Sequence, residues 1–125
     1  MKRLQDMPLQ FVSTNGISMA YRRMGHENKQ ALVLLHGYPQ NHLCWEHIAP
    51  TLAQTYDIIV PDLRGYGHSD APFDETSDHR TYSKREMAKD VLGLMDALSI
   101  PYALILGHDR GDRVADRLGL DSPER

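Results

Sequence analysis

The stretch Ala103-Leu104-Ile105-Leu106-Gly107-His108-Asp109-Arg110-Gly111 decides the fold that this sequence predicts. Its four apolar residues are typical of a buried strand, and residues 110–120 that follow the turn favour a helix. A strand that turns at once into a helix needs small residues two before and two after the tip, because a Cβ there would meet neighbouring backbone. Gly107 and Gly111 meet that need. We therefore expect Asp109, at the tip, to stand at the carboxyl edge of a sheet, where open α/β sheets bind ligands.

A carboxylate at this position favours nucleophilic chemistry. The positive end of a helix dipole and its unpaired N–H groups keep such a group ionised. Asp is also a common helix N-cap, so Asp109 taken by itself fits a structural cap as well. A second motif, His36-Gly37-Tyr38-Pro39, follows another buried strand, and its backbone can reach the same edge of the sheet. The N–H groups of Tyr38 and Arg110 would together form an anion hole, which favours the catalytic interpretation.

The rest of the chain predicts alternating strands and helices after a hairpin. Residues 9–13 and 17–21 alternate around Asn15-Gly16, a dipeptide that favours a tight antiparallel turn. Buried strands are expected at 31–35, 57–61 and 103–106, and helices at 44–54, 83–98 and 110–120. Ser83 and Glu86 indicate a capping box. The fold class is therefore α/β: a mostly parallel sheet between two helical layers, with an antiparallel hairpin at the N-terminus.

Composition excludes several classes of function. The 125 residues are 41% hydrophobic and 25% charged, with a net charge of −3, which offers no basic surface for nucleic acid or membrane. Cys44 is the single cysteine, and the histidines lack metal-ligand spacing, so we expect neither a disulfide framework, a metal nor a cofactor. No signal peptide or membrane span is recognisable, which predicts a cytoplasmic domain.

Three motifs in order resemble the α/β-hydrolases that use an Asp nucleophile. They are residues 36–40 (HGYPQ), residues 62–69 (DLRGYGHS) and residues 107–111 (GHDRG). This family includes epoxide hydrolases and haloalkane and haloacetate dehalogenases. The resemblance implies the N-terminal half of the family fold, with Asp109 as nucleophile. We interpret residues 1–125 as a single partial core domain that lacks the lid and the C-terminal half.

The segment GHDRGDR at 107–113 is similar to the fluoroacetate (haloacetate) dehalogenase pattern, in which two arginines grip the substrate carboxylate. Arg110 and Arg113 are three residues apart, so they share a helix face, and two guanidinium groups suit a small carboxylate. The alternatives for Arg113 are an ion pair with Asp109 and a place in the charge balance of the surface. The alternative for Arg110 is a solvated side chain in the first turn of the helix. Asp112 departs from the small residue expected between the arginines.

We also count His36, Pro39 and the backbone of Tyr38 among the substrate-binding residues, although His36 is more typical of a turn residue than of a catalyst. Arg64, Tyr66 and Ser69 are expected to form a loop network that supports the site, and Trp45 is expected in the core.

The family's chain order is nucleophile, acid and then His, and no His follows Asp109 in the sequence. We therefore expect this chain to form an ester with a haloacetate or similar small carboxylate and to stop there. A homodimer is the expected partner of the full-length form. The alternatives are an epoxide hydrolase-like enzyme and a non-catalytic remnant that serves as a binding module.

Overall fold

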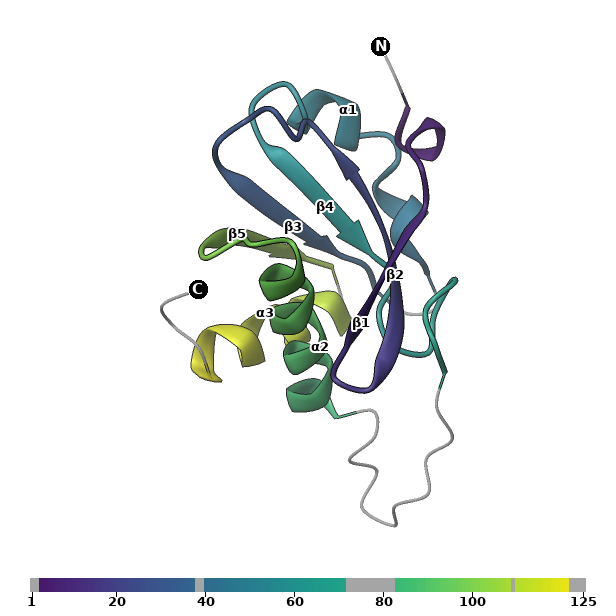
Figure 1. The fold of residues 1–125 in the computed structure, drawn as a ribbon, viewed down its shortest axis with the longest axis vertical. Coiled ribbons are helices and arrows are strands. Elements are labelled where there is room, and N and C mark those ends of the chain that lie inside the picture. The colour runs from purple at the N-terminus through teal and green to yellow at the C-terminus, as the bar shows by residue number, and fades with distance from the viewer. Residues whose placement is uncertain (1–2, 38–39, 72–82, 109, 122–125) are drawn as a thin grey trace.

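A five-stranded mixed sheet forms the centre of the fold (Figure 1). The computed structural model describes residues 3–37, 40–71, 83–108 and 110–121. The strands are β1 (Gln10–Thr14), β2 (Ile17–Met24), β3 (Ala31–Leu35), β4 (Asp57–Pro61) and β5 (Ala103–Gly107), in the spatial order β1-β2-β4-β3-β5. β3 pairs in parallel with both β4 and β5, whereas β2 pairs antiparallel with β1 and β4. The predicted α/β class and N-terminal hairpin are confirmed.

The hairpin turn has the backbone that its sequence predicts. Asn15 and Gly16 have φ angles of 48° and 82°, the left-handed values that a two-residue primed turn requires. Thr14 and Ile17 therefore face each other at the end of the β1–β2 ladder.

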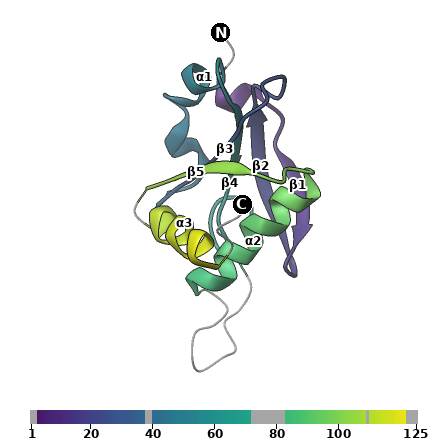
Figure 2. The ribbon, with the colours of Figure 1, turned by 90° about the vertical axis from the view of Figure 1, so that its left-hand side faces the viewer.

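Helices cover both faces of the sheet, as Figure 2 shows. α2 (Lys84–Ala97) and α3 (Arg110–Asp121) lie on one face, where alternate strand residues such as Val33 and Ile59 join their core. The short helices η1 (Leu4–Asp6), η2 (His42–Trp45) and α1 (Ala49–Leu52) belong to the opposite face, with Leu34 and Val60. Two cores back to back confirm the three-layer prediction, and Trp45 lies in the second core as expected.

The continuous helix predicted over residues 44–54 is wrong. The chain forms η2, whose N-terminus is capped by the Asn41 side chain, and then the separate helix α1. Pro50 stands in the first turn of α1, where its missing N–H costs nothing. The same ring further inside a helix would remove a hydrogen bond and clash with the preceding turn, so the helix cannot run through it.

α2 begins where the capping signal predicts. The Ser83 hydroxyl accepts the Glu86 backbone N–H at 3.1 Å. The reciprocal half of the predicted capping box differs, because the Glu86 carboxylate accepts instead from the side chains of Asn15 and Lys89. The cap therefore ties the start of α2 to the tip of the hairpin.

β5 is less covered than the buried strand that its apolar run predicts. Leu104 and Leu106 are 50% and 44% exposed. β5 is the last strand in the order, and its alternate residues Ala103 and Ile105 pack on the core that contains α2 and α3, whereas Leu104 and Leu106 stand half exposed. Within the described part of the chain, no helix has the length and hydropathy to cross a membrane.

Candidate active site

The two motifs that predict the site meet at the carboxyl ends of neighbouring strands. Leu35, the last residue of β3, is the register partner of Gly107, the last residue of β5. The backbone N–H of His108 donates to the Leu35 carbonyl at 3.0 Å, so the two chains leave the sheet side by side. Helix α3 begins at Arg110, which leaves two residues for the turn.

Gly111 shows why this turn needs a residue without a side chain. A Cβ at Gly111 would overlap the backbone carbonyl oxygens of Leu35 and His36. Since backbone cannot move aside cheaply, glycine lets the first turn of α3 lie directly on the end of β3. This is the close approach that the sequence argument requires of a strand–turn–helix elbow.

His36 lies at the centre of this junction and is completely buried. Its Nδ1 is 2.9 Å from the Gly37 carbonyl oxygen, and its Nε2 accepts the Leu63 backbone N–H at 2.9 Å. The Tyr66 ring packs edge-on, with centroids 5.2 Å apart. Burial lowers the pKa of His36, and the Gly37 carbonyl and Asp62 oppose this effect. The ring is therefore held neutral.

Asp62 organises the loop that follows β4. Its buried carboxylate accepts the ring Nδ1–H and the backbone N–H of His42, both at 2.7 Å, and the His68 N–H at 3.0 Å. Burial favours the protonated acid, but these three hydrogen bonds outweigh it and lower the pKa of Asp62. Arg22 Nε donates to the other ring nitrogen of His42 at 2.9 Å, so the imidazole bridges Arg22 and Asp62.

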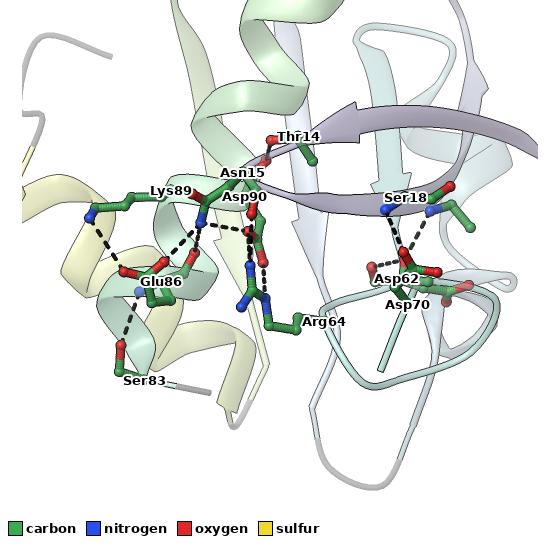
Figure 3. Close-up of polar contacts among 12 residues, drawn as sticks. Thr14, Asn15, Ser18, Asp62, Arg64, Asp70, Ser83, Glu86, Lys89 and Asp90 are labelled. Atoms are coloured by element: carbon green, nitrogen blue, oxygen red, sulfur yellow. Dashed lines mark hydrogen bonds and ion pairs between the residues drawn. The ribbon is translucent and has the colours of Figure 1, made fainter. Parts of the chain in front are cut away.

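The same loop is fastened to α2 by a buried ion pair. Arg64 donates to both carboxylate oxygens of Asp90 at 2.9 Å, and Asn15 from the hairpin tip donates to Asp90 at 3.0 Å (Figure 3). Burial raises the pKa of Asp90, and the hydrogen bonds from Arg64 and Asn15 oppose it. Ser69 completes the loop by donating to the Asp62 carbonyl and accepting the Ala20 N–H. The network expected of Arg64, Tyr66 and Ser69 is therefore present.

A cavity of about 250 Å³ adjoins the elbow. Gln40, Cys44, Trp45, Ile48 and His108 line it, so it joins the turn after β3, the second core and the residue before Asp109. Although Cys44 is exposed as a residue, burial of its thiol raises the pKa to about 11. The thiol is therefore protonated at neutral pH and a poor nucleophile.

Comparison with known proteins agrees with this geometry. Residues 30–125 match the model of the alpha/beta hydrolase fold family. The chain belongs to the α/β-hydrolases.

Relatives with different activities share this part of the hydrolase fold. The chain is 47% identical over 94 residues to a fluoroacetate dehalogenase of Burkholderia sp., covering 75% of this chain and 31% of that protein. It is 38% identical over 108 residues to a soluble epoxide hydrolase of Corynebacterium sp., covering 86% and 35%. A crystal structure of a Salmonella enterica protein assigned as an acyltransferase superposes with a TM-score of 0.90 at 51% identity, covering 95% of this chain and 39% of that one. The chain thus spans about a third of the length of these relatives.

Several predicted site residues of the hydrolase lie outside the described residues, namely Asp109, Tyr38 and Pro39. Arg110 and Arg113 both belong to the first turn of α3, and Arg113 is exposed. Val114 and Leu118 of the same helix are buried in the core beneath α3. His36 is described and buried, with both ring nitrogens bonded to backbone, so its ring does not face an open site.

Sequence reasoning missed two charged or polar partners in this hydrolase. Asp90 stands among the buried residues Met87, Val91 and Leu94 of α2, and a carboxylate within an apolar stripe is a signal that a cation lies opposite. His42, the partner of Asp62, carries no comparable signal, because 20 residues separate the two in sequence.

Proposed function

We propose that the protein is a hydrolase of haloacetate dehalogenase type, with Asp109 as nucleophile. The observation that carries this proposal is the elbow: Gly107 faces Leu35, Gly111 lies against the backbone of Leu35 and His36, and only two residues separate β5 from α3. A carboxylate in such a turn stands at the N-terminus of a helix, which favours its ionised form.

The first chemical step is a displacement at carbon. A carboxylate oxygen of Asp109 forms a bond to the halogen-bearing carbon, and the carbon–halogen bond breaks with its electron pair on the halide. The product is a carboxymethyl ester of Asp109 and a free halide ion. No proton is transferred in this step, so it needs no base.

Arg110 and Arg113 are proposed to hold the substrate carboxylate. Both belong to the first turn of α3, directly after the nucleophile. The positive charge of an Arg side chain is unfavourable near the positive end of a helix dipole, and a bound anion would offset that cost. The 47% identity to a fluoroacetate dehalogenase supports a substrate of this class.

The second step is hydrolysis of the ester by water. The N–H groups of Tyr38 and Arg110 are proposed to stabilise the oxyanion that forms when water adds to the ester carbonyl. Water addition also needs a base, and none of the residues after Asp109 is a His. The 125 residues are therefore expected to form the ester, and turnover is expected only where a base is also supplied.

The proposal is tested with the product of the complete reading frame and fluoroacetate or chloroacetate. Halide release is expected in the wild type, and Asp109→Asn should abolish it. Arg113→Ala should raise KM for haloacetate by about 10-fold or more, since one charge-assisted contact is worth about 1.5–3 kcal/mol. Absence of halide release from the folded wild type contradicts the proposal.

An epoxide hydrolase is the second candidate, and it is favoured by the 38% identity to a soluble epoxide hydrolase over 86% of the chain. The same elbow would open an epoxide through an ester of Asp109. A neutral epoxide has no carboxylate for Arg113, so Arg113→Ala should leave diol formation almost unchanged. Assaying both substrates with this one variant separates the two functions.

A further inference from the structure

We propose that the neutral ring of His36 is a positioning residue, which holds the turn at residues 36–40 in place by tying it to the loop at residues 62–70. The inference rests on the proposed function for its effect on the reaction, whereas the tie itself is a property of the fold.

The tie consists of two hydrogen bonds on opposite sides of one ring. Nδ1 lies 2.9 Å from the Gly37 carbonyl oxygen on the turn, and Nε2 accepts the Leu63 N–H at 2.9 Å on the loop. The ring is completely buried, and Tyr66 from the same loop packs against it at an interplanar angle of 78°. The imidazole therefore has one orientation available.

These partners also select one protonation state. The Leu63 N–H can only donate, so Nε2 must be unprotonated, and the Gly37 carbonyl can only accept, so Nδ1 must carry the proton. The groups that face the ring are the Asp62 carboxylate, the His42 imidazole and the Tyr66 ring. If His36 carried a second proton, on Nε2, that N–H would face the Leu63 N–H, and two donors cannot form a hydrogen bond with each other.

The loop is the anchored side of this pair. It is fixed by the three hydrogen bonds to the Asp62 carboxylate and by the ion pair of Arg64 with Asp90. A Cβ at Gly67 would overlap the Asp62 carboxylate, so the loop closes tightly around that group. The loop is therefore held in place by its own contacts, and the turn can be positioned against it.

Two hydrogen bonds join Gly37 to Gln40, the described residues on either side of positions 38 and 39. The Gln40 backbone N–H donates to the Gly37 carbonyl at 2.9 Å, and the Gly37 N–H donates to the Gln40 side chain at 3.2 Å. Both bonds join residues of the same turn. The Gly37 carbonyl also accepts the His36 ring proton, so the ring links this carbonyl to the Leu63 N–H of the loop.

Two substitutions of His36 separate its two bonds. The side-chain nitrogen of Asn can take the place of Nδ1, so His36→Asn keeps a donor for Gly37 and removes the acceptor for Leu63. The side-chain oxygen of Gln can take the place of Nε2, so His36→Gln keeps the acceptor and removes the donor. The control is His47→Asn, because the His47 side chain is 91% exposed.

Amide hydrogen exchange measured by NMR tests the two hydrogen bonds of the His36 ring without any assay of activity. In His36→Asn we expect the Leu63 amide to exchange about 5-fold faster, and the Gln40 amide to exchange faster too, although its own acceptor is intact. In His36→Gln the Leu63 amide should stay protected while Gln40 exchanges faster. Unchanged exchange at Gln40 in both variants overturns the proposal.

A measurement on the wild type covers the case in which neither variant folds. The ¹⁵N shifts of the His36 ring should show a protonated Nδ1 and an unprotonated Nε2 at neutral pH. The opposite tautomer, or a doubly protonated ring, overturns the proposal.

Activity tests the consequence for the reaction. Because the turn is proposed to stabilise the oxyanion of ester hydrolysis, His36→Asn in the complete product should slow that step and lower kcat about 10-fold. The Asp109 ester should then accumulate, and KM should fall together with kcat. A rise in KM with no ester accumulation overturns the positioning role. If the wild type turns over neither haloacetate nor epoxide, the proposed function fails, and the exchange data still decide the inference.

Discussion

Leu35 and Gly107 face each other at the carboxyl ends of the parallel strands β3 and β5. The turn at residues 36–40 and the elbow at residues 107–111 therefore leave the sheet side by side, although about 70 residues of sequence lie between them. The proposed anion-binding turn and the proposed nucleophile must be neighbours to act on one substrate. This register supplies that condition through backbone pairing.

Gly111→Ala should destabilise the protein strongly. The new methyl group would overlap two backbone carbonyls, and such overpacking costs about 1–3 kcal/mol or more. The matched control is Gly119→Ala in the same helix, since nothing lies within 4 Å of a Cβ there. That control should stabilise the helix by about 0.5–1 kcal/mol. Urea denaturation measures both, and equal effects of the two substitutions would contradict the account of the elbow.

The Arg64–Asp90 pair should behave as a buried ion pair. Asp90 is completely buried, so Asp90→Leu removes the carboxylate that compensates the buried Arg64 charge and should cost about 3–5 kcal/mol. The double variant Arg64→Met, Asp90→Leu should recover part of that loss. Denaturation of the single and double variants gives the coupling free energy.

The exposed pair of Arg3 with Asp6 is the control for this cycle, because Arg3→Ala should cost less than about 1 kcal/mol. Additive losses in the Arg64–Asp90 cycle would mean that the two side chains do not act as a pair.

Ser99→Gly should stabilise the chain. Ser99 follows α2 with φ of 58°, and the Ile100 N–H closes the helix end on the Met95 carbonyl. A left-handed backbone costs a non-glycine residue about 1 kcal/mol, and glycine is the usual residue at this position. Thermal and urea denaturation should both show the gain. Ser99→Ala keeps a Cβ and should show none, so a gain in the Ala variant would rule out relief of this strain.

Stability should fall as the pH drops below about 6.5, and His36 should be one cause. Burial lowers the pKa of His36 in the folded state, so between that pKa and the unfolded value the unfolded chain binds a proton that the native chain does not. The free energy of unfolding therefore rises with pH through this window, and the contribution of His36 is lost as the pH falls. His36→Gln should flatten that slope, while His47→Asn should leave it unchanged. A slope unaffected by His36→Gln contradicts the neutral, buried ring.

Local patterns predicted most of the fold. Asn15-Gly16 fixes the hairpin turn, and Ser83 fixes the start of α2, because each signal acts within a few residues. The break at Pro50 has a signal in the sequence, but the apolar spacing from Trp45 to Leu52 is met equally by two short helices.

The supporting network could be predicted only in outline. The bonds of Asp62 to His42 and of Arg64 to Asp90 join residues 20 and 26 positions apart, and their pairing depends on tertiary packing rather than on local sequence. The exposure of Leu104 and Leu106 likewise depends on what lies beside β5, not on the apolar run itself.

If Asp109 is the nucleophile, a haloacetate leaves its adduct on that carboxylate, and locating the adduct is the most direct test. The 125-residue chain should gain one carboxymethyl group, and peptide mass spectrometry should place it on Asp109 in the wild type and nowhere in Asp109→Asn. Cys44 is the internal control, because its protonated thiol should stay unmodified at neutral pH. An adduct on Cys44 in place of Asp109, or no adduct on the folded chain, would contradict the account.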